Sequence, residues 1–134
     1  MRHNAIIVCV VLLAGGFSIV GCSSKAPTTN ISCNLSDTQI TNFTTMALAG
    51  DGGAAFRLFD YYSFAAYDYA TALKWLKVAA TNGNLSGQYN LAQEYEGQFG
   101  TNMIDLKQAR YWYQRAADAG DADAKRKLVE LKSQ

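Results

Sequence analysis

The sequence has little of what enzymes and metal sites most often use. Its 134 residues contain one histidine, His3, and one proline. Histidine is the commonest general base and the commonest metal ligand, so its scarcity argues against a metal site or acid–base catalysis. Twelve Lys and Arg against eleven Asp and Glu leave no basic excess of the kind that binds nucleic acid. We therefore expect no metal, no cofactor and no nucleic-acid partner.

Familiar catalytic motifs are also missing from the sequence. It contains no Gly-x-Ser-x-Gly, Ser-x-x-Lys, Cys-x-x-Cys or glycine-rich phosphate loop. Glu94 and Glu96 stand two apart, so they would face away from each other on a helix. Asp60 and Glu94 could still form a glycosidase-like pair if they came from adjacent hairpins, although chance and solvation explain them better. The sequence predicts a protein that is not an enzyme.

The N-terminus resembles a bacterial lipoprotein precursor. Arg2 and His3 precede an uncharged stretch of sixteen residues, 5–20, which is shorter than the roughly 20 residues that span a bilayer. The stretch ends in Ile19-Val20-Gly21-Cys22, which is similar to the lipobox of such precursors. The resemblance implies cleavage before Cys22, followed by attachment of diacylglycerol and a further acyl chain such as palmitate to this residue.

The resemblance also implies an address and a division of the chain. An Asp after the lipidated Cys resembles a mark for retention in the inner membrane, so Ser23 at this position favours the outer membrane, with the protein facing the periplasm. We expect residues 1–21 to be the signal peptide, 22–34 a lipidated flexible tether, and 35–134 the folded domain. Cys33 has no partner for an intramolecular disulfide, because Cys9 leaves with the signal peptide and Cys22 carries lipid. It is either a free thiol or a link between molecules.

A self-similar pattern occupies the second half of the chain. Segment 68–80 matches segment 105–117, 37 positions later, with the same Asp, Ala, Trp and Ala-Ala. Glycines followed by Asp or Asn recur at Gly50, Gly83 and Gly120. A period of this length indicates helical units that stack on one another.

These residues resemble the Sel-one-like repeat, a helical-hairpin relative of the tetratricopeptide repeat. The resemblance covers about residues 47–131 and implies an all-α fold, a short α-solenoid of helical hairpins. The first copy departs from the motif, with no glycine between Tyr62 and Asp68, so we expect a tighter loop there. The second copy is the closer match and carries Gly83-Asn84, Tyr89, Leu91-Ala92, Tyr95, Gly97, Gly100, Asp105, Ala109, Trp112-Tyr113 and Ala116-Ala117.

The residues themselves support stacked hairpins. Apolar groups recur every three to four positions, so they lie on one helix face that a single hairpin cannot bury. Trp75 and Trp112 are expected to fill the space between hairpins. The repeated glycines suit chain reversals with positive φ, and Asp51, Asn84 and Asp121 suit caps of the helices that follow. Small residues that would allow close helix approach are Ala72, Ala79, Ala80, Ala109, Ala116 and Ala117.

Two flanking helices are expected to close the stack. Ser36 and Asp37 can cap a helix whose apolar residues, including Ile40, Phe43 and Met46, cover its open end. The helix 121–132 is polar, as a terminal cap should be. Its basic cluster could instead contact acidic lipid or a partner, although cations are also favoured near a helix C-terminus.

Positions that differ between copies provide a candidate binding surface. In this family the first helix of each hairpin lines the concave side, and residues three and four apart are neighbours on a helix. An ordinary solvated face is the alternative. An aromatic cluster surrounds the first loop, and about half of its residues are expected to belong to the core: Tyr61, Tyr62, Phe64, Tyr67 and Tyr69. The predicted partner-binding groove consists of Arg57, Asp60, Tyr61, Asn90, Gln93 and Glu94.

Three functions follow from these resemblances. The first is a lipid-anchored envelope protein whose repeats bind another protein as an adaptor or scaffold, held to the membrane through Cys22. The second is an immunity lipoprotein that neutralises a type VI lipase or another toxin directed at the periplasm. The third, an envelope hydrolase, is less favoured, because relatives proposed to act on β-lactams carry a disulfide in each repeat and this chain does not.

Overall fold

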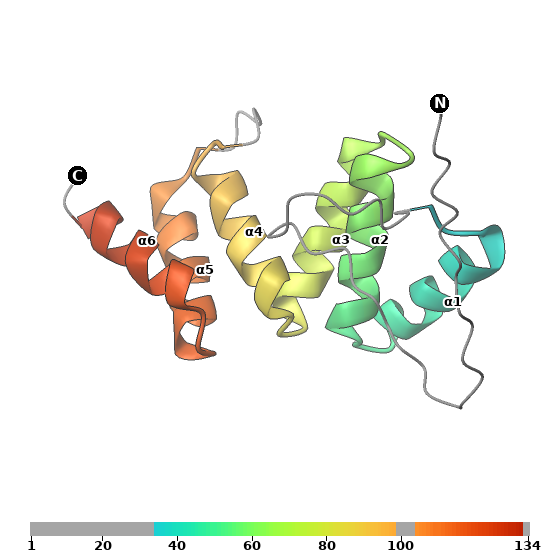
Figure 1. The fold of residues 1–134 in the computed structure, drawn as a ribbon, viewed down its shortest axis with the longest axis horizontal. Helices are drawn as coiled ribbons and strands as arrows, with labels where there is room; N and C mark the ends of the chain where they lie inside the picture. The colour runs from blue at the N-terminus through green and yellow to red at the C-terminus, as the bar shows by residue number, and fades with distance from the viewer. Residues whose placement is uncertain (1–33, 99–103, 133–134) are drawn as a thin grey trace, which may run out of the picture.

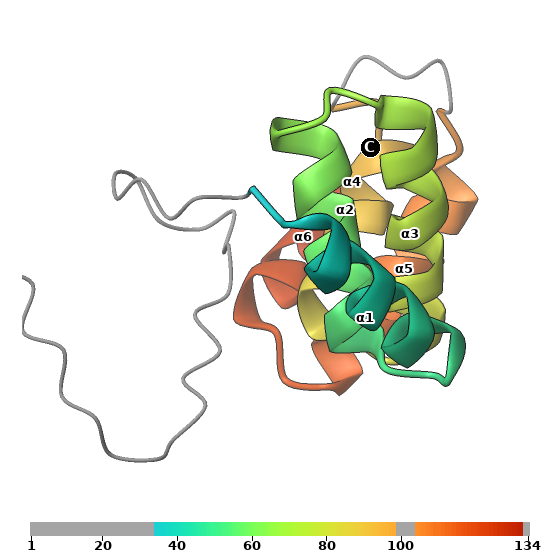
Figure 2. The ribbon, with the colours of Figure 1, turned by 90° about the vertical axis from the view of Figure 1, so that its right-hand side faces the viewer.

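A computed structural model describes residues 34–98 and 104–132. Within these ranges the chain is all-helical, with α1 (Asp37–Leu48), α2 (Gly52–Phe64), α3 (Tyr69–Thr81), α4 (Leu85–Tyr95), α5 (Leu106–Asp118) and α6 (Ala122–Lys132). Helices α2 to α6 alternate in direction along a row, and α1 crosses the open end (Figures 1 and 2). The expected α-solenoid is confirmed. The expected signal peptide and the tether up to Cys33 lie outside the described residues.

Each helix begins at a side chain that accepts hydrogen bonds from the first turn. The caps of α1 to α5 are Ser36, Asp51, Asp68, Asn84 and Asp105, and Asp121 does the same for α6. Donor–acceptor distances to the third residue after each cap lie between 2.7 and 3.3 Å. Such bonds satisfy backbone N–H groups that have no partner within the helix. The caps expected from the sequence are therefore confirmed.

Glycine reverses the chain after α1, α3 and α5. Gly50, Gly83 and Gly120 have φ values of 100°, 81° and 101°, where a residue with a Cβ would be strained. Between α2 and α3 the chain uses no glycine, and Tyr67 takes the positive φ of 54° instead. This loop spans residues 65–68, so it is tighter than the connection between α4 and α5, as expected.

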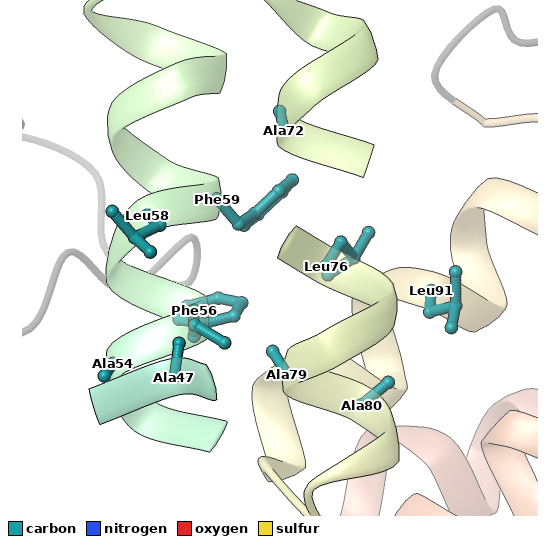
Figure 3. Close-up of a cluster of buried hydrophobic side chains, with 11 residues drawn as sticks. Ala47, Ala54, Phe56, Leu58, Phe59, Ala72, Leu76, Ala79, Ala80 and Leu91 are labelled. Atoms are coloured by element: carbon teal, nitrogen blue, oxygen red, sulfur yellow. The ribbon is translucent and has the colours of Figure 1, made fainter. Parts of the chain in front are cut away.

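The core consists of two neighbouring clusters of buried side chains. In the first, Leu58 of α2, Leu76 of α3 and Leu91 of α4 are all within 1% of full burial (Figure 3). The second lies between α4, α5 and α6 and includes Tyr113. Trp112 packs against both clusters, as expected of a residue between hairpins, whereas Trp75 packs against the first.

Small residues let α3 and α4 approach closely. A Cβ added to Gly87 would lie 2.9 Å from Ala79 Cβ and 3.0 Å from the backbone nitrogen of Ala80. Real Cβ atoms essentially never approach another atom as closely as the first distance, and the second is tighter than nearly all such contacts. A side chain at this position would therefore require the helices to shift. The six alanines expected at such contacts are all buried.

The flanking helices cover the ends of the stack. In α1, Ala47 is buried and Ile40 and Phe43 pack against the first cluster, but Met46, expected on the covering face, is 44% exposed. In α6, Leu128 and Leu131 complete the second cluster. None of the helices within the described ranges is long and apolar enough to cross a membrane.

Candidate protein-binding surface

The six residues of the predicted groove lie on two adjacent helices, α2 and α4, as expected. The structure divides them into two groups by exposure. Arg57, Tyr61 and Gln93 are partly exposed and can contact another molecule. The other three are buried, with exposures of 2% for Asp60, 5% for Asn90 and 1% for Glu94.

The expectation that all six are free of packing duty is therefore wrong for Asp60, Asn90 and Glu94. These residues differ between repeats, but each lies where neighbouring helices exclude water. A polar group in such a place costs free energy unless it is hydrogen-bonded, so its identity depends on the local contact rather than on a partner. Binding by any of the six stays a prediction.

Glu94 joins the two hairpins. Its Oε1 accepts a hydrogen bond from the phenol of Tyr69, in the first turn of α3. Burial, together with this hydrogen bond and the charge of Glu94, raises the pKa of Tyr69 well above its usual value. The phenol therefore stays protonated and keeps donating. Glu94 is a structural link between α3 and α4, not the solvated carboxylate expected from the sequence.

A second polar link joins α4, α5 and α6. Glu96, which ends α4, accepts a hydrogen bond of 2.7 Å from the phenol of Tyr113 in α5. Its other carboxylate oxygen lies 3.4 Å from the ammonium nitrogen of Lys127 in α6, which is also 3.5 Å from a carboxylate oxygen of Glu130. Burial first, and then the bond to Glu96, raise the pKa of Tyr113 well above its usual value. Glu94 in α4 and Glu96 at its C-cap therefore connect this helix to its neighbours.

Sequence reasoning missed this link because its members are far apart in the chain. The sequence identifies Tyr113 as a residue of the repeat motif and places Lys127 in the polar end-cap helix 121–132. Nothing in the spacing indicated that Lys127 reaches back over thirty positions to Glu96. The available signal was a bulky tyrosine in the repeat motif, since a buried tyrosine usually finds a partner for its hydroxyl.

Asp60 is the unusual group on this surface. Among the residues that the structure describes, no donor reaches its buried Oδ2, and the buried hydroxyl of Ser63, one turn later, likewise has no hydrogen-bond partner. Desolvation raises the pKa of Asp60 to about 7, against the opposing effect of the positive charge on Arg57. The guanidinium of Arg57 lies 6.0 Å from the ring centroid of Phe43 in α1, within the range of a cation–π contact. Asp60 is thus a titratable group between the end cap and the first repeat.

The carboxylates do not resemble a glycosidase pair. Asp60 and Glu94 are both buried rather than presented to solvent, and Glu94 is held by Tyr69. Among residues 34–98 and 104–132, no group of three His, Cys, Asp or Glu side chains could hold a metal ion. The burial of both carboxylates therefore argues against the glycosidase-like pair that the sequence left open.

The aromatic residues around the first loop also divide into two groups. Tyr62 packs against the first core cluster and makes an edge contact with Tyr61 at 5.1 Å between ring centroids. Tyr69 is partly buried against Glu94. Phe64 and Tyr67 are exposed, by 56% and 84% of their surface.

Comparisons with known proteins agree with this architecture. The family model of the Sel1 repeat matches residues 53–84 and 85–121. Uncharacterized protein YibG of Escherichia coli (strain K12) is 32% identical over 111 residues, which cover 81% of this chain and 72% of YibG. No solved structure matches the chain.

Proposed function

Because the chain belongs to the Sel1 repeat family, whose hairpins generally mediate protein–protein interaction, we propose that it is a lipid-anchored envelope protein whose repeat domain binds another protein. The family is typically a non-catalytic module, which agrees with an adaptor or scaffold. The support for the anchor is the lipobox-like order Ile19-Val20-Gly21-Cys22. Outer-membrane placement rests on Ser23 and is part of the same proposal.

The observation that carries the binding role is the partly exposed group on α2 and α4. Arg57 and Tyr61 lie one turn apart on α2, and Gln93 occupies the neighbouring helix. Arg and Tyr are enriched among the residues that contribute most to protein interfaces. The hydrogen bond between Tyr69 of α3 and Glu94 of α4 holds α4 against the first hairpin, to which α2 belongs. A surface held in place before binding loses less conformational entropy when a partner arrives.

Site-specific crosslinking tests this proposal. A photoreactive amino acid placed at Tyr61 of the full-length protein should crosslink one protein in the cell envelope. The same amino acid at Lys74, which is exposed on the neighbouring outer helix α3, serves as the control and should not. Equal crosslinking from both positions, or none from Tyr61, would contradict the assigned surface.

Affinity for the crosslinked protein then tests the individual side chains. Arg57→Ala or Tyr61→Ala should each weaken binding by about 30-fold, since truncating an interface anchor costs about 2 kcal/mol. Lys74→Ala should leave the affinity unchanged. If the captured partner is a lipase or another toxin and its activity is blocked in the complex, the protein is an immunity lipoprotein rather than an adaptor.

A further inference from the structure

Four exposed apolar residues lie along one edge of the stack. Phe64 is the last residue of α2, and Tyr67 lies in the loop that follows it. Ile104 comes just before α5, and Leu106 is the first residue of α5. Their exposures are 56%, 84%, 71% and 42%, respectively. Figures 1 and 2 show the end of α2 and the start of α5 on the same side of the molecule, opposite the turns that precede α2, α4 and α6. We call these four residues the apolar edge.

Tyr67 is strained as well as exposed. At a φ of 54° it is the one residue other than glycine with a positive φ in the described ranges. Hydrogen bonds on either side hold the turn, from Ala66 N to Tyr61 O at 3.0 Å and from Asp68 N to Tyr62 O at 2.8 Å. Glycine would adopt this conformation without strain and would expose no ring. Folding therefore gives no reason for a tyrosine at this position.

We propose that the apolar edge lies on the surface of a phospholipid bilayer, with the rings of Tyr67 and Phe64 among the lipid headgroups. This inference rests on the proposed lipid anchor at Cys22. Tyrosine suits the headgroup region because its ring is apolar and its hydroxyl is polar. The two acidic residues nearby, Asp68 and Asp105, cap α3 and α5, so their charges lie against the positive ends of helices.

The reach of the chain before the domain supports a membrane as the occupant. The twelve steps from Cys22 to Asn34 span at most about 40 Å at about 3.5 Å each. In both ribbon views, the start of the described chain lies nearer the apolar edge than the opposite turns (Figures 1 and 2). An anchored domain on so short a connection experiences a local concentration of membrane in the millimolar range, so weak contacts are enough.

Docking by this edge leaves the proposed protein-binding surface open. Helices α2 to α6 run between the apolar edge and the opposite turns (Figure 1). With the edge on the bilayer they stand upright, and the faces of α2 and α4 that carry Arg57, Tyr61 and Gln93 point sideways. The proposed protein-binding surface would then bind its partner at a defined distance from the bilayer.

An environment-sensitive dye at single positions tests the contact. The full-length lipidated protein, with Cys33→Ser, is placed in vesicles of phosphatidylethanolamine and phosphatidylglycerol, and a nitrobenzoxadiazole dye is attached to Tyr67→Cys. Leu48→Cys, 75% exposed at the opposite edge, is the matched control. We expect a blue shift and quenching by brominated lipid at position 67 and neither at position 48. The same response at both positions, or none at position 67, overturns the proposal.

Two further variants separate this inference from the lipid anchor and from folding. Replacing the Cys22 lipid by a hexahistidine tag on nickel-chelating vesicles tests the edge even if mass spectrometry finds no lipid on Cys22. On these vesicles a dye at Ile104→Cys should lose at least half of its lipid quenching when Tyr67→Gly is added. The same change should raise the thermal midpoint, because it relieves the positive φ. Unchanged quenching with Tyr67→Gly overturns the proposal.

Discussion

Gly87 offers a sharp test of how the hairpins are stacked. It lies in the first turn of α4, against the end of α3. A Cβ at this position would be 2.9 Å from Ala79 Cβ, 3.1 Å from Ala79 C and 3.0 Å from Ala80 N. Two of these atoms belong to the backbone and the third is attached directly to it. The Gly87→Ala variant therefore cannot be accommodated by rotating a side chain, and α3 and α4 must move apart.

Two effects of opposite sign determine how much Gly87→Ala changes the free energy of unfolding. Overfilling a packed core costs about 1–3 kcal/mol, whereas alanine is better than glycine in a helix by about 1 kcal/mol at most. The gain is smaller in a first turn, where the helix is only beginning. We expect Gly87→Ala to lower the free energy of unfolding by about 1–2 kcal/mol. For a domain of this size, each kcal/mol corresponds to a fall of roughly 4–8 °C in the thermal midpoint.

Urea and thermal unfolding followed by far-ultraviolet circular dichroism measure this effect. Gly53→Ala is the control, since Gly53 also lies in a first turn but is exposed, and an added Cβ would meet only the Asp51 carboxylate, at 3.1 Å. This variant should stay within about 0.5 kcal/mol of wild type, as surface substitutions usually do. A Gly87→Ala protein as stable as wild type, or equal losses in both variants, would refute the close approach of α3 and α4.

Three other predictions address the anchor, the core and the buried carboxyl. Cys22→Ser should abolish lipid attachment and release the protein from the membrane fraction, as measured by mass spectrometry and fractionation; equal membrane association of both proteins would contradict it. Trp112→Ala should lower the free energy of unfolding by about 3 kcal/mol and Trp75→Ala by less, because Trp112 packs against both core clusters; urea denaturation that ranks them in the reverse order would contradict this assignment. Asp60→Asn should be as stable as wild type near pH 4 and more stable at pH 8. In wild type the pKa of Asp60 is raised from 3.8 to about 7 in the folded state, so the protonated carboxyl stabilises the folded protein at low pH and this stability is lost as the pH rises to about 7. The difference is at most about 4 kcal/mol at about 1.4 kcal/mol per pKa unit, and denaturation at several pH values would show a flat difference if Asp60 titrated normally.

The repeat pattern predicted most of the fold because its signals are local. A glycine that ends one helix and a capping side chain that begins the next lie side by side in the chain, as at Gly83 and Asn84. Apolar periodicity within a single helix then selects the face that enters the core. These features require no knowledge of distant contacts, which explains why helix order and chain reversals were predictable.

The candidate site was less predictable because burial of a polar residue depends on its neighbours in space. Variation between repeats suggested that Asn90 and Glu94 were exposed, but variation also occurs where a polar residue meets a different partner in each repeat. Glu94 is buried because Tyr69 supplies its donor from the preceding helix. Asp60 is buried and interacts with the charge of Arg57, whose guanidinium lies near Phe43 of α1. The element that precedes α2 is the single helix α1 instead of another hairpin.

The polar links of α4 have a consequence for a stack this short. In a solenoid each repeat contacts only its neighbours, so two repeats leave few interfaces to define their relative position. Apolar packing tolerates some sliding, whereas a hydrogen bond depends on direction and distance. Glu94 and Glu96 provide such bonds on either side of α4, to Tyr69 and to Tyr113. Glu94 and Glu96 thus help to fix the angle between the hairpins. The exposed residues on α2 and α4 therefore keep a defined spacing, which a partner could recognise.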